Sequence, residues 1–154
     1  MATAAEMSAA GELAGRVALV TGAAGGIGSA VTAGSISGQV GMAQQAAYGT
    51  TKAAVTLLTR QLAVEYAPSG LRANVVAPGA IDTAFVARSR AGAAAEQATP
   101  EAEEARRRRI MTSHPIGRMG TPQEIAEVIV FLASPRASYI TGAIISADGG
   151  YTAI

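Results

Sequence analysis

Three residues of this chain have types and spacing that suit proton transfer. Tyr48 and Lys52 are four positions apart, about one helical turn, so on a helix their Cβ atoms would lie roughly 5–6 Å apart. An unperturbed phenol keeps its proton up to about pH 10, and a neighbouring ammonium favours the phenolate. Tyr48 is therefore a candidate general acid/base, and the Ser35 hydroxyl could orient a substrate oxygen. Taken alone, the pair is more simply explained as a tyrosine and a lysine on an ordinary helix surface.

A second feature precedes these residues: a short apolar segment that runs into a glycine-rich turn. Residues 16–21 are mostly aliphatic and are bounded by Gly15 and Gly22, which is typical of a buried parallel strand. The following segment, Thr21 to Gly28, reads T-G-A-A-G-G-I-G. Glycines let a backbone turn tightly and approach a pyrophosphate at a helix N-terminus. Because a strand pattern precedes it, we interpret the turn as a dinucleotide-binding loop rather than a flexible linker.

The motifs resemble those of the short-chain dehydrogenase/reductase family, in particular its 3-oxoacyl-reductase-like members. The turn from Thr21 to Gly28 matches the family's T-G-x-x-x-G-x-G pattern. Ser35, Tyr48 and Lys52 match the family's active-site serine and its Tyr-x-x-x-Lys pair at the family's spacing. The resemblance therefore implies that these three residues are catalytic.

Two later segments extend the resemblance, which covers the chain from about Leu13 to Tyr151. Pro78 to Thr83 is similar to the proline-glycine loop that contacts the nicotinamide end of the cofactor, and Asp148 to Gly150 resembles the turn after the last strand. The resemblance implies that NAD or NADP is held by residues of these motifs. They are Thr21, Gly22, Gly26, Ile27, Gly28, Tyr48, Lys52, Pro78, Gly79, Ile81 and Thr83.

By this resemblance the chain is an NAD(P)-dependent oxidoreductase that interconverts a secondary alcohol and a ketone. Tyr48 would exchange the hydroxyl proton, Lys52 would favour the phenolate and hold the nicotinamide ribose, and Ser35 would position the carbonyl. The hydride chemistry belongs to the cofactor. The lack of a basic residue at positions 23–25 favours NAD over NADP. The family also implies a homo-oligomer formed through the helix expected at residues 46–67.

One spacing departs from the family pattern. Only six residues separate Gly28 from Ser35, whereas parallel strands need a crossover of roughly a dozen residues or more. A six-residue strand spans about 20 Å, and a helix over Gly26–Ala30 would rise only about 7 Å. We therefore expect that the connection cannot return to the other end of the sheet. By resemblance, strands two to four are missing with their helices, including the residue that selects NAD or NADP and the catalytic asparagine.

The expected fold is thus a truncated Rossmann-type α/β domain with a doubly wound parallel sheet. Residues 1–12 are expected to be a disordered leader, and 13–154 a single incomplete domain. Residues 84–100 resemble the family's mobile substrate lid. The other elements expected from the sequence pattern are a remnant strand 31–33, a helix 46–67, a strand 71–77, a charged helix 101–111, a helix from the capping box at Thr121 to about 133, and a strand 143–146.

An alternative function follows from the apparent deletion. The chain could be a catalytically inactive remnant that keeps the 46–67 helix as a dimerisation module, or that completes its sheet by strand exchange. A folded dimer without cofactor affinity would favour this alternative. A monomeric aggregate would contradict it.

Composition and the remaining motifs exclude several other functions. A net charge of +1 and a pI of about 8.2 give no electrostatic basis for binding nucleic acid or membrane, and a cytoplasmic protein is expected. One histidine and no cysteine make a metal site implausible. A Ser35–His114–Asp82 hydrolase is rejected because nothing in the sequence places His114, expected in a loop, near Ser35. The basic run 106–109 is expected to be a solvated helix face, since glutamates precede it, rather than a phosphate-binding patch.

Overall fold

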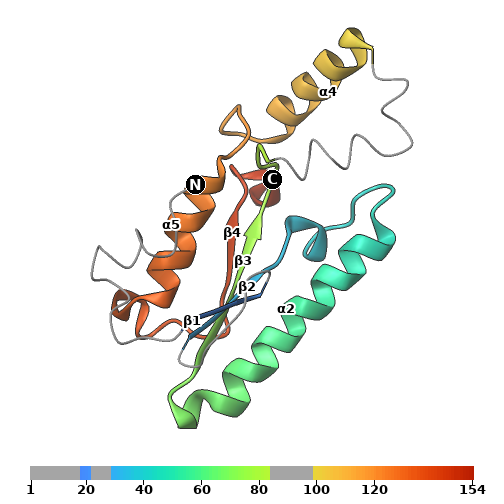
Figure 1. Ribbon diagram of the computed structural model, residues 1–154. Coiled ribbons are helices and arrows are strands. Elements are labelled where there is room, and N and C mark those ends of the chain that lie inside the picture. Colours follow the sequence, from blue (N-terminus) through green and yellow to red (C-terminus); the bar gives the residue numbers. More distant parts are fainter. Residues whose placement is uncertain (1–17, 22–28, 84–98) are drawn as a thin grey trace.

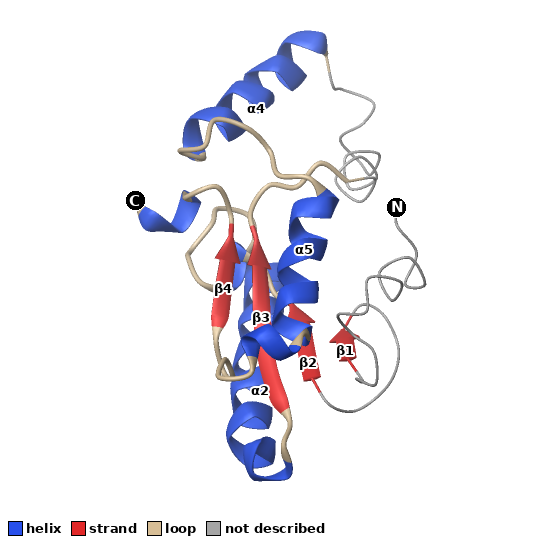
Figure 2. Ribbon diagram, turned by 90° about the vertical axis from the view of Figure 1, so that its left-hand side faces the viewer, coloured by secondary structure: helices blue, strands red, loops and turns tan. Residues whose placement is uncertain are grey.

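The computed structural model describes residues 18–21, 29–83 and 99–154, which form a parallel sheet with a helix on each face (Figures 1 and 2). The sheet has four strands in the order β1-β2-β3-β4, and all neighbours pair in parallel. The main elements are β1 (Ala18–Thr21), β2 (Ser29–Ala33), α2 (Ala46–Tyr66), β3 (Arg72–Pro78), α4 (Pro100–Ser113), α5 (Pro122–Ala133) and β4 (Ile144–Ala147). The expected α/β class and parallel sheet are confirmed.

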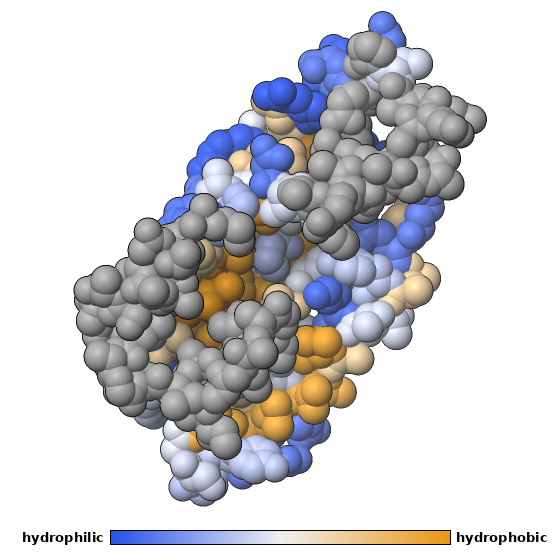
Figure 3. All heavy atoms as spheres, viewed as in Figure 1, coloured by the Kyte–Doolittle hydropathy of each residue, from blue (hydrophilic) through white to orange (hydrophobic). Residues whose placement is uncertain are grey.

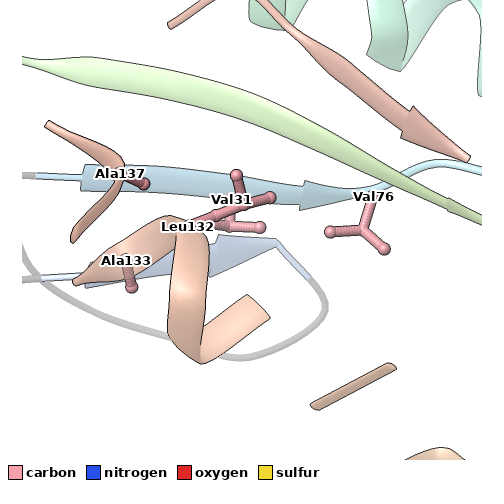
Figure 4. Close-up of a cluster of buried hydrophobic side chains, with 5 residues drawn as sticks. All are labelled: Val31, Val76, Leu132, Ala133 and Ala137. Atoms are coloured by element: carbon pink, nitrogen blue, oxygen red, sulfur yellow. The ribbon is translucent and has the colours of Figure 1, made fainter. Parts of the chain in front are cut away.

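The face of the sheet covered by α5 holds the main apolar core (Figure 4). Val31 on β2 and Val76 on β3 pack with Leu132 and Ala133 of α5, and with Ala137 in the turn after it. All five side chains are almost completely buried. Burying one leucine contributes about 1.5–3 kcal/mol, so this cluster attaches α5 firmly to the centre of the sheet.

The opposite face of the sheet meets α2 through small and polar side chains. Ala30 and Ala73 of the sheet cluster with Ala63 of the helix, which lets the helix approach the strands closely. Thr59 of α2 and Thr32 of β2 join their hydroxyls at 2.8 Å in the same interface. The side of α2 that contacts the sheet therefore consists mainly of alanines and threonines, with the partly buried Leu62 beside them.

The ends of α2 and α5 follow local sequence signals. After α2 the chain continues into the 3-10 turn η2 (Ala67–Ser69), which contains Pro68, and Gly70 closes this turn at a φ of 82°. Such a positive φ strongly favours glycine. At the start of α5, Thr121 accepts a hydrogen bond from the Glu124 amide while the Glu124 carboxylate accepts one from the Thr121 amide. The expected capping box is confirmed.

Asn74, the single asparagine of the sequence, lies in the middle of β3 and is fully buried. Its amide donates to the Ile140 carbonyl at 2.9 Å, and its side-chain oxygen accepts from the Ala143 amide at 3.1 Å. Asn74 therefore fixes the segment that leads into β4, and its role is structural.

The expectation that the first connection cannot return across the sheet is wrong. β1 pairs in parallel with β2, with Ala18 opposite Ser29 and Thr21 opposite Thr32. The four described residues of β1 span roughly 13 Å at 3.3 Å per residue. Seven residues can reach at most about 23 Å when fully extended, which exceeds this span and is compatible with the observed pairing.

Some expectations fall outside the described residues. These are the leader 1–12, residues 16 and 17 of the first strand pattern, the glycine-rich turn at 22–28 and most of the lid at 84–98. Within the described part of the chain, no helix combines the length and apolar character needed to cross a bilayer.

Candidate active site

The carboxyl ends of the parallel strands all point to one edge of the sheet (Figure 2), and the candidate site lies beyond them. Ser35 follows β2, Gly79 follows β3 and Asp148 follows β4. Because all strands are parallel, these ends lie together, and in open α/β sheets this edge is where ligands bind.

Ser35 lies where the chain leaves β2 and enters the 3-10 turn η1 (Ile36–Gly38). Its backbone is extended, and its hydroxyl accepts a hydrogen bond from the Ser37 amide at 3.2 Å, which caps the turn. The same hydroxyl donates to Ser37 Oγ at 3.3 Å. Ser35 is only 8% exposed, so its hydroxyl is held in one position at the edge of a cavity.

Tyr48 and Lys52 project from the first half of α2, one turn apart as their spacing predicts. Lys52 Nζ lies 5.7 Å from the centroid of the Tyr48 ring and donates a hydrogen bond to the Ala33 carbonyl at 2.9 Å. This bond ties the ammonium to the end of β2, two residues before Ser35. Tyr48 is 42% exposed, which leaves its phenol open to a ligand.

Two glycines allow the η1 turn to lie directly against α2. A Cβ on Gly38 would come within 2.8 Å of the Lys52 carbonyl carbon, and a Cβ on Gly49 within 2.6 Å of the Ser37 carbonyl oxygen. Both distances are too short for real Cβ contacts. Glycine at these positions therefore permits the approach that brings the Ser35 turn beside the Tyr48 turn.

A cavity of about 670 Å³ opens between these elements. Its wall is formed by residues from four separate chain segments, 35–48, 79–80, 109–114 and 151. They include Ser35, Tyr48, Gly79, His114 and Tyr151. Its volume falls in the range of about 300–1,000 Å³ that is typical of small-molecule sites.

His114 lies in a loop, as expected, but it is close to Ser35, which the sequence did not indicate. It directly follows α4, is only 5% exposed, and lines the same cavity as Ser35. Its Nε2 accepts from the Ala80 amide at 3.2 Å, while Nδ1 lies 2.8 Å from the Ile110 carbonyl. A carbonyl oxygen can only accept a hydrogen bond, so Nδ1 must carry a proton and donate it to Ile110. Both ring nitrogens are therefore engaged by backbone groups. His114 therefore shares a cavity with Ser35 but is not available as its general base.

Sequence reasoning also missed that α4 contributes to the cavity. Arg109, Ile110 and Ser113 line it, and their spacing of three and four residues places them on one side of the helix. That spacing, continued to His114, is the signal that could have revealed this face. The expected solvated surface is correct for Arg107, Arg108 and Arg109, which are all exposed, and of these three Arg109 also lines the cavity.

The loop that begins at Pro78 bridges two cavities. Gly79 lines the larger cavity, and its amide donates to the Ala147 carbonyl at 3.1 Å. This holds the loop close to the end of β4, where a Cβ at position 79 would lie only 2.8 Å from Asp148 Cα. Ile81 lines a second cavity of about 290 Å³. Thr83, the last residue predicted to contact the cofactor, is partly buried.

Asp148 organises the turn that follows β4. Burial raises the pKa of its carboxyl, but hydrogen bonds outweigh this effect and hold the pKa below its ordinary value. They come from the Thr152 hydroxyl at 2.6 Å, the Thr152 amide at 2.9 Å and the Gly150 amide at 3.0 Å. The ordered turn positions Tyr151, whose ring centroid lies 5.1 Å from that of His114 in the cavity wall.

The residues at this edge fit the nicotinamide-ribose end of a dinucleotide. Lys52 uses one ammonium proton for the Ala33 carbonyl, which leaves two donors for ribose hydroxyls. The cavity is large enough for a nicotinamide ring beside a small alcohol. The predicted pyrophosphate-binding residues Gly22, Gly26, Ile27 and Gly28 lie outside the described residues, as does everything that would orient them.

Comparison with known proteins identifies relatives of this chain. The family whose sequence model is described as Enoyl-(Acyl carrier protein) reductase matches residues 1–152. A curated relative, the inactive 2-(S)-hydroxypropyl-CoM dehydrogenase 2 of Xanthobacter autotrophicus, is 46% identical over 82% of this chain and 52% of its own. The cis-4-hydroxycyclohexanecarboxylate dehydrogenase of Sinomonas cyclohexanicum is 45% identical over 92% of this chain and 52% of its own.

Solved structures agree with these relatives. The structure of ElxO with NADP bound superposes with a TM-score of 0.69 and 35% sequence identity, and the match covers 82% of this chain and 47% of ElxO. The chain thus spans about half the length of the proteins it matches. The arrangement of Ser35, Tyr48 and Lys52 beside the sheet, the family match and these likenesses agree, and the chain belongs to the short-chain dehydrogenase/reductase family.

Proposed function

We propose that this chain is an NAD(P)-dependent oxidoreductase that interconverts a secondary alcohol and a ketone, with Tyr48 as general acid/base. The observation that carries the proposal is the position of Lys52, whose ammonium lies 5.7 Å from the Tyr48 ring and is fixed to the end of β2. The hydroxyl of Ser35 lies at the wall of the same cavity as Tyr48.

In the reducing direction, Tyr48 donates its phenolic proton to the carbonyl oxygen of the substrate. The Ser35 hydroxyl turns its proton from Ser37 Oγ to the same oxygen and orients it, and the Lys52 ammonium stabilises the phenolate that remains. Bound NAD(P)H supplies the hydride that reaches the carbonyl carbon, so the proton from Tyr48 completes the alcohol. Oxidation of the alcohol reverses each transfer.

We propose that the nicotinamide ribose is held by Lys52, and the nicotinamide by the loop containing Pro78, Gly79, Ile81 and Thr83. Two findings support a nicotinamide cofactor. The similar structure of ElxO contains NADP, and the relative from Sinomonas is named a cis-4-hydroxycyclohexanecarboxylate dehydrogenase. NAD remains the cofactor that the sequence favours.

The short chain length bears on this proposal. The relative from Sinomonas is matched over 142 residues, which are 92% of this chain but only 52% of its own. We propose that the difference includes an internal block between Gly28 and Ser35. Turnover by this chain therefore requires that the remaining cofactor contacts suffice, or that a second copy completes them.

A titration of the chain with NADH and NADPH, followed by nicotinamide fluorescence, tests cofactor binding. We expect saturable binding, and substitution Tyr48→Phe should lower turnover by about 10²-fold or more while leaving this binding unchanged. Tyr66→Phe is the matched control, because Tyr66 lies on the same helix with a similar exposure, 47% against 42%. Absence of binding by a folded sample would exclude the proposed activity for this chain.

A second proposal concerns assembly, and the outer face of α2 supports it. Leu57, Leu58 and Val64 are 58%, 59% and 75% exposed. The space-filling view shows apolar residues gathered over α2 at the lower right (Figure 3). Apolar side chains concentrated on one side of a helix are typical of a partner interface. We propose that two copies associate through this face, either as an enzyme or as a non-catalytic dimerisation module.

Light scattering coupled to size exclusion tests this assembly. Leu58→Lys should convert the dimer to a monomer, because a cation would be placed in an apolar interface. Tyr139→Lys is the control, since Tyr139 is fully exposed and lies far along the chain from α2. A monomeric wild type would exclude the interface. A dimer that binds neither NADH nor NADPH would favour the dimerisation module over the enzyme.

A further inference from the structure

The larger cavity has a strong asymmetry of charge. Among its described lining residues, Arg109 is the single one that carries a permanent charge, and none is an aspartate or glutamate. Half of the others are apolar residues or glycines, including Ile36, Met42 and Ile110, and the other half have polar side chains, including Ser35 and Tyr48. A ligand in this cavity therefore meets both apolar and polar side chains, one guanidinium and no described carboxylate.

The guanidinium of Arg109 is also free to bind a ligand. No hydrogen bond or ion pair joins it to another side chain among the residues that the structure describes. Its neighbour Arg108 differs, because Arg108 Nε lies 3.8 Å from Glu104 Oε1 on the outer surface of α4. Arg109 is exposed, and a cation that lacks an internal partner and lines a cavity without a described carboxylate is suited to bind an anion from solution.

Arg109 is positioned by the part of α4 that is attached to the site. The His114 ring contacts the Ile110 carbonyl at the end of this helix, and its Nε2 accepts from the Ala80 amide of the loop after β3. The turn carrying Arg109 is thereby fixed relative to the edge of the sheet where Ser35 and Tyr48 lie.

We propose that this cavity binds a substrate with an apolar body and a terminal carboxylate, and that Arg109 binds the carboxylate while the hydroxyl or carbonyl lies at Tyr48 and Ser35. This substrate class rests on the oxidoreductase function proposed above. A guanidinium binds a carboxylate through two parallel hydrogen bonds. One unpaired cation balances the single charge of a carboxylate better than the double charge of a phosphate monoester.

Calorimetric binding of 5-hydroxyhexanoate and of its methyl ester to the full chain tests the proposal without requiring turnover. The two probes differ in charge but share the secondary alcohol and the apolar chain. We expect the acid to bind about tenfold more tightly than the ester, since a charge-assisted hydrogen bond contributes enough for one such factor. Arg109→Gln should remove this preference by weakening the acid alone, and Arg109→Lys should restore part of it.

Arg107→Gln is the matched control. Arg107 lies on the same helix, is exposed and does not line the cavity, so it makes the same change in net charge away from the site. Equal weakening by Arg107→Gln and Arg109→Gln would overturn the proposal, because it would show nonspecific attraction by a basic helix. Equal affinities for acid and ester, or no saturable binding of the acid, would also overturn it.

Two further arms separate related explanations. Tighter binding of hexyl phosphate than of 5-hydroxyhexanoate would overturn the carboxylate and assign the site to a phosphate. If the acid binds with the expected dependence on Arg109 but NADH does not bind, the anion site is supported and the oxidoreductase function fails. The two proposals can therefore fail separately.

Discussion

Substitution Gly49→Ala is expected to displace the turn that carries Ser35 without unfolding the protein. The added Cβ would lie 2.6 Å from the Ser37 carbonyl oxygen, whereas ordinary contacts begin near 3.4 Å. The turn η1 or the first turn of α2 must therefore move by about 0.8 Å, the difference between these distances. Because the Ser35 hydroxyl caps the same turn through the Ser37 amide, Ser35 moves with it.

Two opposing effects determine the stability of this variant. Alanine is about 1 kcal/mol better than glycine inside a helix, while overpacking of a tight contact costs about 1–3 kcal/mol. The expected result is a free energy of unfolding lowered by up to about 2 kcal/mol. The effect on the site is larger, because a misplacement of about 1 Å in catalytic geometry can cost 10²-fold in rate.

Urea denaturation and amide NMR spectra measure these effects separately. Ala47→Gly is the control, since Ala47 is exposed in the same first turn of α2 and reports helix propensity alone. The amide signals of Ser35 and Ser37 should shift in Gly49→Ala and stay in place in Ala47→Gly. If Gly49→Ala gains as much stability as Ala47→Gly loses, and these signals do not move, the close contact between η1 and α2 does not exist.

Two further predictions concern stability. A hydrogen bond from Arg118 and others from Thr121 lower the pKa of Glu124 to about 2, so its stabilising effect is complete above its ordinary pKa near 4.5 and is lost as the pH falls toward 2. At pH 7 the melting temperature of Glu124→Gln should therefore lie below that of wild type. This difference in melting temperature should shrink as the pH is lowered to 2, and a difference that stays constant with pH would contradict the role of the Glu124 carboxylate. In Thr59→Val the buried Thr32 hydroxyl loses its 2.8 Å partner and keeps only a longer hydrogen bond of 3.4 Å to the Asn74 carbonyl. The free energy of unfolding, measured by urea denaturation, should fall by about 1–3 kcal/mol. The exposed Thr51→Val should stay within about 0.5 kcal/mol, and equal losses would refute the role of the buried pair.

Features governed by neighbouring residues could be predicted from the sequence. The relation of Tyr48 to Lys52 depends only on helical spacing, and the start of α5 depends on the side chains of Thr121 and Glu124. In both cases the partners lie within one helical turn of each other. The structure confirms both arrangements because no distant contact competes with them.

The orientation of α2 could not be predicted in the same way. Its sequence has more than one apolar stripe, and the leucines would be the first choice for burial. In the structure Leu57 and Leu58 are exposed, while Thr59 and Ala63 face the sheet. The reason lies in the partner surface, because Ala73 and Ala30 offer small side chains against which the small residues of α2 pack closely, with Leu62 at the side. Periodicity in α2 alone contains no information about those strands.

The contribution of α4 to the site was beyond sequence reasoning for a different reason. A basic run preceded by glutamates reads as a solvated surface, and its described arginines are indeed exposed. Whether Arg109 also lines a cavity depends on how the helix is attached, and that is decided by His114 and its bonds to Ile110 and Ala80. The bond to Ala80 joins residues 34 positions apart in the sequence.

The hydrogen bonds that position the candidate residues Ser35 and Lys52 come from β2 and later segments, and β1 contributes indirectly through its pairing with β2. Ser35 depends on the end of β2, Lys52 is fixed to Ala33 of the same strand, and His114 is held by the loop after β3. All of these contacts lie between residues 29 and 154, and none involves β1. The contacts that bring Ser35, Tyr48 and Lys52 together therefore do not come from the segment predicted to bind the cofactor pyrophosphate. For the proposed enzyme, loss of cofactor affinity and loss of the arrangement of these three residues can then be measured as separate outcomes.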